Sequence, residues 1–177
     1  MRFVLAAAVA AVGVVAGAQD DAGGRYVSKD GGYSIKFPKG ATPKTKTQDA
    51  PGGLTMVMTI TEQDKKSHVA MFMELPAGTL KAIPAKSILD GASGGALQKS
   101  GGKAVSQTDF AFGKGKLPAR ELVVDKDGMV VKTHIIVADP KVFVLVVGGP
   151  DKYGTSKAAT EFLNSFEILP PAKAKAD

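Results

Sequence analysis

Apolar and polar residues alternate along most of the chain, and this pattern predicts a protein built chiefly from β-strands. One run places Tyr33, Ile35 and Phe37 on the same side of an extended backbone. Residues 142–147 are apolar throughout, which is typical of a strand covered on both faces. Clusters of glycine, proline and aspartate separate the runs and predict turns between them. The predicted strands are residues 26–28, 33–37, 44–47, 54–61, 68–75, 104–112, 119–124, 129–137 and 142–147.

The middle of the chain changes to a helical period. Pro84 is favoured as the first residue of a helix, because the missing N–H would have no partner there. A narrow apolar stripe follows at Ala85, Ile88, Leu89 and Ala92. Each glycine in a helix interior costs about 1 kcal/mol relative to alanine, and three lie between residues 91 and 95. We therefore expect this helix to be short or broken.

A second helix is predicted near the end of the chain. From Ser156 onward, Ala159, Phe162, Leu163 and Phe166 fall on one helical stripe. The order is thus mostly strands, a central helix, further strands and a closing helix. That order predicts an α+β fold in which helices pack on a mainly antiparallel sheet.

The N-terminus has the features of a secretory signal peptide. Arg2 supplies the positive charge, residues 3–15 are largely apolar, and Ala16-Gly17-Ala18 is a small-residue cleavage site. The apolar run is shorter than the roughly 20 residues that span a bilayer. We therefore expect residues 1–18 to be removed after Ala18 and the product to be periplasmic or secreted.

Size and composition indicate one domain. The chain has 177 residues, a formal net charge of +6 and no cysteine, which excludes a disulfide scaffold and a lipid-anchored lipoprotein. Short tails rich in small or polar residues are expected at 19–24 and 170–177. We expect a monomer with a single domain at residues 25–169 and no transmembrane segment.

Three segments resemble a known family. Residues 33–40 are similar to the opening strand and Pro-x-Gly turn of PsbP-like domains. Residues 142–149 and 162–166 are similar to that family's last strand and closing helix. The resemblance extends over residues 26–169 and is closest to an exported bacterial branch. It implies the α/β/α sandwich that PsbP-like proteins share with Ran-binding Mog-type proteins.

A serine-hydrolase motif is present in sequence. Residues 91–95 match G-x-S-x-G around Ser93, and Asp109 or Asp125 and then His134 follow in the order of a catalytic triad. That motif needs a strand entering a sharp turn, whereas helical periodicity precedes Ser93. The pattern favours a glycine-rich helix end, with a small hydrolase as the alternative.

Four methionines form a second candidate site. Met56, Met58, Met71 and Met73 lie on two neighbouring predicted strands, with His68 near one strand end. If the two strands present these residues on one face, the thioethers could bind a soft ion such as Cu(I). The same faces carry other apolar residues, so the pattern favours adaptable core packing beneath a helix, with soft-metal binding as the alternative.

Neither the histidines nor a glycine-rich loop predicts a metal or phosphate site. His68 and His134 have neither a cysteine nor a second histidine nearby, so no zinc site is predicted and both are interpreted as surface residues. Residues 113–116 lack the spacing of a phosphate-binding P-loop and are interpreted as a basic hairpin loop.

Basic side chains supply the third candidate site, for an anionic partner. If they converge, they could bind an acidic envelope polymer or an acidic protein; if not, lysines on an exposed strand guard it against aggregation. Aromatic residues are not interleaved with them, so nucleic acid is not predicted. The candidates are Lys36, Lys39, Lys44, Lys46, Lys114, Lys116 and Arg120.

The sequence therefore predicts an exported, non-enzymatic binding or accessory domain without a cofactor. Soft-metal binding through the methionines and hydrolysis through Ser93 are the alternatives.

Overall fold

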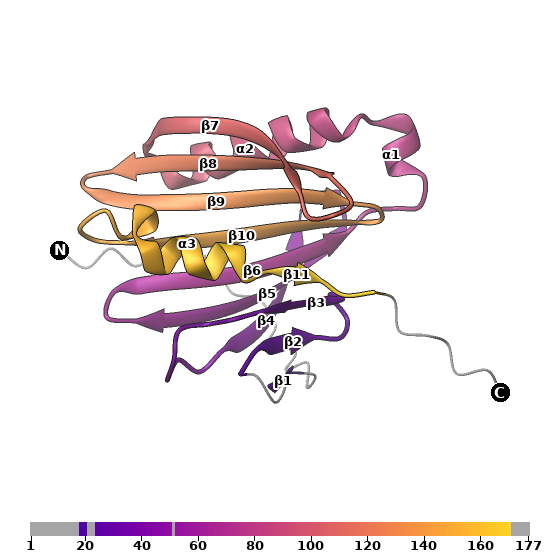
Figure 1. Ribbon diagram of the computed structural model, residues 1–177. Coiled ribbons are helices and arrows are strands. Elements are labelled where there is room, and N and C mark those ends of the chain that lie inside the picture. The colour runs from indigo at the N-terminus through magenta and orange to yellow at the C-terminus, as the bar shows by residue number, and fades with distance from the viewer. Residues whose placement is uncertain (1–17, 21–23, 51, 171–177) are drawn as a thin grey trace.

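A large antiparallel sheet forms the centre of the molecule (Figure 1). The computed structural model describes residues 18–20, 24–50 and 52–170. The apolar run at 142–147 lies in an interior strand, as predicted. From edge to edge the seven strands are β4 (Lys44–Ala50), β5 (Leu54–Gln63), β6 (Lys66–Glu74), β10 (Lys141–Gly149), β9 (Met129–Ala138), β8 (Leu117–Lys126) and β7 (Lys103–Phe112).

A smaller sheet packs beside the large one, and the sequence did not predict it. Its order is β1 (Ala18–Asp20), β2 (Tyr26–Ser28), β3 (Tyr33–Ile35) and β11 (Glu167–Ile168). The β2–β3 hairpin was expected, but the pairing of β11 with β3 joins the two ends of the domain. The tail expected at 19–24 is wrong for residues 19–20, because β1 pairs with β2.

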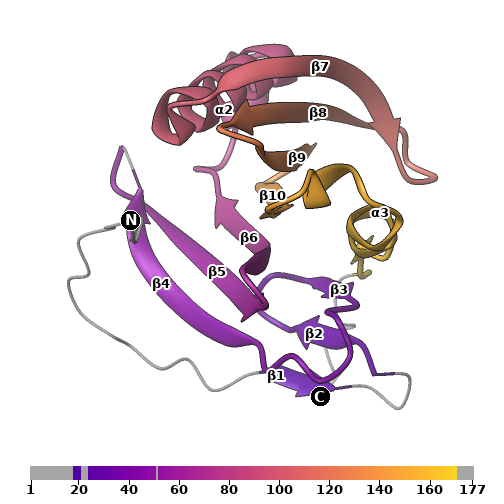
Figure 2. The same ribbon diagram turned by 90° about the vertical axis from the view of Figure 1, so that its left-hand side faces the viewer.

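Helices lie on both faces of the large sheet (Figure 2). The short α1 (Thr79–Ala82) precedes α2 (Ala85–Ser100), which packs on β8 and β9. On the opposite face, a 3-10 turn η1 (Tyr153–Thr155) leads into α3 (Lys157–Asn164), which packs on β10. No helix within the described residues is long and apolar enough to cross a membrane. The α+β class is confirmed.

Helix α2 is longer than predicted. It continues through Gly91, Gly94 and Gly95 and ends where Gly101 adopts a left-handed conformation with φ of 62°. A Cβ atom at any of the three internal glycines would meet nothing within 4 Å, so packing does not require glycine there. The expectation of a short or broken helix is wrong, because tertiary contacts of the buried face outweigh weak local propensity.

The larger core cluster lies between the main sheet, the small sheet and α3. Tyr33 contacts the rings of Phe72, Phe143 and Phe166 with centroids 5.3–6.2 Å apart. Phe166 is buried as expected, but it follows the C-terminal end of α3 rather than lying on its stripe. A smaller core cluster fills the space beneath α1 and α2 on the other face.

Candidate functional site

Four methionines meet on one face of the β5–β6 hairpin. A two-residue turn at 64–65 joins the strands and is shorter than the loop expected from the sequence. The resulting register places Met58 directly opposite Met71 and Met56 opposite Met73. Directly opposed residues share a sheet face, with Cβ atoms about 5 Å apart.

Only one of these methionines lies beneath a helix. Met73 packs against the smaller core cluster under α1 and α2. Met56, Met58 and Met71 are half-buried and belong to neither core cluster of the described residues. The interpretation of all four as core side chains is therefore wrong for three of them, because α2 packs on β8 and β9, beyond β10.

The uncovered surface, here named the open face, spans β4, β5, β6 and part of β10. In Figure 2, no described helix lies beside β4 and β5 on the side of the sheet that α2 occupies. Its apolar side chains are half-buried, and its polar ones lie on the edge strand β4. The open face consists of Lys44, Lys46, Gln48, Met56, Met58, Ile60, Val69, Met71 and Val146.

Two lysines border the methionines. Lys46 lies opposite Met58 in the β4–β5 register, and Lys44 lies opposite Ile60. Both lysines are exposed, and neither forms an ion pair with a carboxylate of the described residues. The strand predicted at 44–47 is confirmed and lies at an edge of the large sheet, where it places two available positive charges beside an apolar surface.

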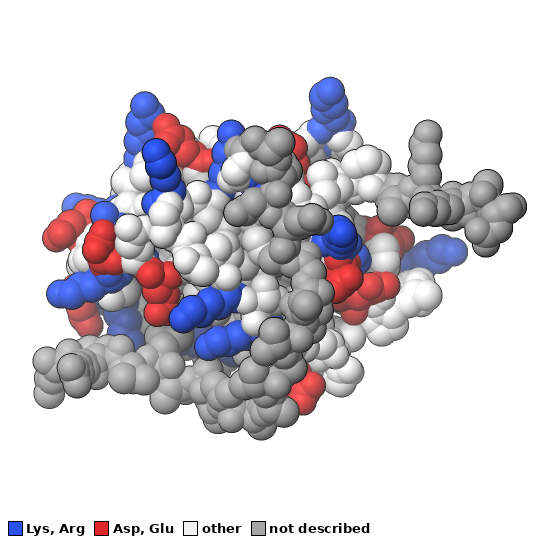
Figure 3. All heavy atoms as spheres, turned by 90° about the horizontal axis from the view of Figure 1, so that it is seen from below, with Lys and Arg blue, Asp and Glu red and all other residues white. Residues whose placement is uncertain are grey.

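The remaining candidate lysines lie elsewhere. Lys36 and Lys39 are exposed in the connection between β3 and β4, and Lys36 lines a hollow beside α3. Lys114 and Lys116 lie in the β7–β8 loop, at the opposite edge of the sheet from β4. Seen from below, basic and acidic side chains are interspersed rather than gathered into one basic surface (Figure 3). The structure does not bring the two basic groups together.

Arg120 does not belong to an exposed basic group, and that prediction is wrong. Its side chain is 2% exposed and reaches from β8 toward α2. The guanidinium donates to both Asp109 oxygens at 2.5 and 3.1 Å, to Asp90 at 2.7 Å and to the Ser93 hydroxyl at 3.0 Å. Hydrogen bonds from Arg120 hold the pKa values of Asp90 and Asp109 below their usual range. This cluster fastens α2 to the sheet.

The residues of the hydrolase motif do not form a triad. Ser93 lies within α2, and its hydroxyl donates to the Leu89 carbonyl at 2.7 Å while accepting from Arg120. His134 lies on the other face of the sheet, since its neighbour Ile135 pairs with Arg120 on the α2 side. The His134 ring contacts Glu121 at 3.0 Å. Serine and histidine are therefore separated by the sheet.

Both histidines are buried, contrary to the surface interpretation. His68 is 2% exposed, and its Nε2 lies 3.0 Å from the Tyr153 hydroxyl. It faces the side of the sheet opposite Met71, so it cannot join the methionines. Burial, with a contribution from Lys66, lowers the pKa of His68 to about 4. No group of three His, Cys, Asp or Glu side chains suited to a metal occurs among the described residues.

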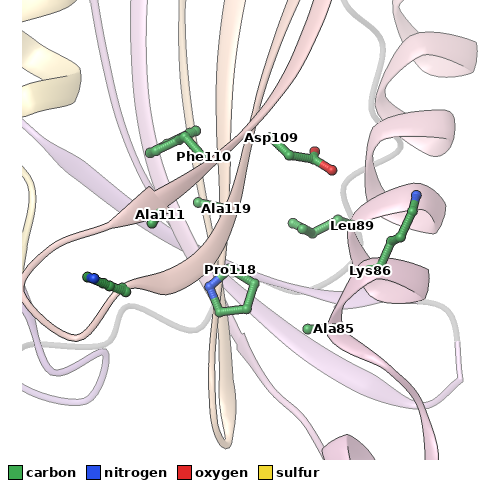
Figure 4. A pocket seen from close by; sticks show the side chains of 9 residues that line it. Ala85, Lys86, Leu89, Asp109, Phe110, Ala111, Pro118 and Ala119 are labelled. Carbon is green, nitrogen blue, oxygen red and sulfur yellow. The ribbon is translucent and has the colours of Figure 1, made fainter.

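A wide pocket of about 420 Å³ opens between the start of α2 and the β7–β8 hairpin (Figure 4). Leu89, Pro118 and neighbouring alanines form its apolar floor. Two of its three charged lining residues are engaged by neighbours outside the pocket, because Asp109 is held by Arg120 and Lys86 pairs with Asp90 at 3.2 Å; the third is Lys116, in the β7–β8 loop. This pocket is therefore a weaker candidate than the open face, whose lysines have no such partner.

Comparison with known proteins identifies the fold. No family model and no curated protein matches the sequence. The structure is similar to the solution structure of cyanobacterial PsbP (CyanoP) from Synechocystis sp. PCC 6803, with a TM-score of 0.57 and 14% sequence identity. The match covers 92% of this chain and 98% of that chain, so this protein has a PsbP-like fold.

Proposed function

We propose that this protein is an exported, non-enzymatic binding domain that holds its partner on the open face. The observation that carries this proposal is that Met56, Met58 and Met71 lie half-buried in an apolar surface that no described helix covers. A sheet face of this kind is ordinarily packed against another layer. A contiguous apolar surface left in contact with water typically marks an interaction site.

The wider assignment belongs to the same proposal. The signal-peptide pattern at residues 1–18, most of which lies outside the described residues, supports cleavage after Ala18 and a periplasmic or secreted location. The PsbP-like fold supports an accessory or binding domain. From the sequence pattern, the proposal also takes residues 25–169 as one α/β/α sandwich domain of an exported bacterial branch, with a tail at 170–177. A binding role is favoured over hydrolysis because the hydroxyl of Ser93 is engaged with Leu89 and Arg120.

The test compares capture of partners by two matched variants. Met58→Gln/Met71→Gln makes the open face polar, whereas Val105→Gln makes the same kind of change on β7, at the far edge, where Val105 is 63% exposed. Each protein is immobilised and exposed to envelope extract from the source cell after its unfolding midpoint has been checked. The proposal expects the open-face variant alone to lose the captured species. Equal capture by all three proteins would contradict it.

Soft-metal binding remains the second candidate function. Its support is the register, which places Met56, Met58 and Met71 as neighbours on one face, and thioethers are ligands that suit a soft ion. The neighbouring Lys46 is unfavourable for a cation, so we rank this function below protein binding. Titration with Ag(I), followed through methionine methyl NMR signals, tests it. Met129, exposed in the β8–β9 hairpin, supplies an internal control.

A further inference from the structure

We infer that the occupant of the open face is an amphipathic helix of a partner protein, with acidic side chains along one border of its apolar stripe. This inference rests on the proposed function and specifies the partner's chemistry. It follows from the width of the uncovered surface, the kind of side chains on it and the position of its two charges.

The shape of the surface fits a helix. Neighbouring strands are about 4.8 Å apart, and a helix with its side chains is about 10 Å wide, so one helix covers about two strands. Helix α2 occupies the sheet over β8 and β9 and runs roughly along the strands (Figure 1). On the same face, β5 and β6 offer a second position of similar width beside it. A helix placed there would complete the layer that α2 begins.

The apolar side chains suit such a helix. Met56, Met58 and Ile60 follow one another along β5, and Val69 and Met71 lie opposite on β6. Methionine is unbranched and polarisable, so a methionine surface adapts to the side chains placed on it. The apolar stripe of an amphipathic helix, with residues at intervals of three and four, would pack on these two rows.

The two lysines on β4 determine the sign of the charge expected on the partner. Lys44 and Lys46 lie on the outer strand β4, beside the apolar rows, and form no ion pair with the described carboxylates. Glu62 lies at the far end of β5, beyond Ile60. Acidic residues along the helix border nearest β4 would therefore meet two lysines, whereas basic residues would be repelled.

Addition of an extended strand explains the surface less well. A strand added to the free edge of β4 would satisfy backbone groups but would leave Met58 and Met71 uncovered, since edge pairing extends a sheet sideways. The lysines on β4 also disfavour such pairing.

The experiment uses two synthetic helical peptides of about 18 residues, each with the same leucine stripe. One carries glutamates along the border of the stripe, and the other carries lysines at the same positions. Each is titrated into the full chain by fluorescence anisotropy at low and high salt. The methyl signals of Met56, Met58 and Met71 are followed in parallel, with Met129 as the control. Lys44→Gln/Lys46→Gln and Met58→Gln/Met71→Gln are compared with Lys114→Gln/Lys116→Gln, which changes two lysines at the opposite edge.

We expect the glutamate peptide to bind about tenfold more tightly than the lysine peptide at low salt, with the difference shrinking as salt rises. Lys44→Gln/Lys46→Gln should abolish the preference, Met58→Gln/Met71→Gln should abolish binding, and Lys114→Gln/Lys116→Gln should change neither. Equal binding of the two peptides, or unchanged methionine signals, would overturn the inference. A dimer of the free protein that buries the same methionines would also overturn it.

Failure of the helix inference can be distinguished from failure of the proposed function. If the open-face variant loses capture of natural species but neither peptide binds, the open face is a binding surface for a partner of another shape. If that variant loses neither capture nor peptide binding, both proposals fail.

Discussion

Met58 and Met71 lie directly opposite each other across the β5–β6 hairpin, two residues away from the part of the same face that the helices cover. Met73, the next residue of β6 on that face, is packed against the smaller core cluster. The boundary between the core and the open face thus lies between Met71 and Met73 on β6. The open face is therefore held by the same strands that form the core.

Replacing the two opposed methionines with leucine separates packing from sulfur chemistry. Met58→Leu and Met71→Leu conserve volume, so we expect each to cost less than about 1.5 kcal/mol of unfolding free energy. Binding of the glutamate peptide should persist because the surface stays apolar. Denaturant unfolding and peptide titration measure the two effects. Retained stability with lost Ag(I) binding would instead favour the soft-metal function.

Arg120 should stabilise the attachment of α2. Arg120→Lys keeps the positive charge, but lysine cannot donate at once to Asp90, to both oxygens of Asp109 and to Ser93. We expect Arg120→Lys to lower the unfolding midpoint more than Asp109→Asn, which removes the negative charge and one acceptor oxygen but keeps the other. An Arg120→Lys protein as stable as the wild type would show that packing alone attaches the helix.

The same cluster predicts sensitivity to strong acid. Hydrogen bonds from Arg120 lower the pKa values of Asp90 and Asp109 in the folded state. The two carboxylates therefore contribute their full stabilisation of the folded state above the usual carboxyl pKa of about 4. This stabilisation is lost as the pH falls through the lowered folded values. The free energy of unfolding should therefore decrease less between pH 5 and pH 2 for Asp109→Asn than for the wild type. Denaturant unfolding at a series of pH values measures this.

His68 should make the protein less stable in mild acid. Burial lowers its folded pKa to about 4, while the unfolded value is about 6.5. The neutral His68 therefore favours the folded state fully above pH 6.5, and this stabilisation is lost as the pH falls toward 4. The free energy of unfolding should fall by about 2 kcal/mol from pH 8 to pH 5. His68→Gln should remove this difference in unfolding free energy. The pKa of His134 is also lowered by burial, so His134→Gln is the comparison that separates the two histidines.

Phe166 should be essential for stability. Its ring contacts Tyr33, Phe112 and Phe143, which connects the small sheet to the edge and the centre of the large one. Truncation of a buried phenylalanine typically costs about 3–5 kcal/mol, a large share of the roughly 5–15 kcal/mol available to a domain. Denaturant unfolding of Phe166→Ala measures the loss. Val105→Ala, at an exposed position, should change stability by less than about 0.5 kcal/mol.

Cleavage of the leader is tested by mass. We expect the protein exported by a bacterial host to begin at Gln19, because Ala16-Gly17-Ala18 fits the small-residue rule. Intact-mass measurement of the exported product decides the matter. A product that retains residues 1–18 would contradict the proposed location.

Local pattern was sufficient to predict most of the strands. Alternation with a period of two depends on the backbone alone, and a turn such as that at 125–128 needs few residues to form. The antiparallel sheet, its polar edge strand and the apolar strand in its interior therefore agree with the structure. The meeting of four methionines also followed from alternation, because one hairpin contains them all.

The local sequence pattern could not predict which of the two apolar faces of the sheet a helix covers. In β6, Ala70 and Phe72 form one apolar row and Met71 and Met73 form the other, so the sequence pattern is nearly the same for both. The burial of Arg120 and the two histidines also depended on neighbours distant in sequence. Arg120 is buried because Asp90 on α2 and Asp109 on β7 pair with it, and neither partner is adjacent to it in the sequence.

By itself, the sequence determined the strands of the large sheet, most of the hairpins that join them and the presence of α2 and α3, since each depends on the spacing of side chains along a short segment. The tertiary structure alone decided that α2 stops short of β5 and β6 and that β11 closes the small sheet against β3. The physical reason is that a helix covers about two strands, and which two it covers is fixed by long-range contacts such as those of Arg120 with Asp90 and Ser93. The open face is the surface that those contacts leave uncovered.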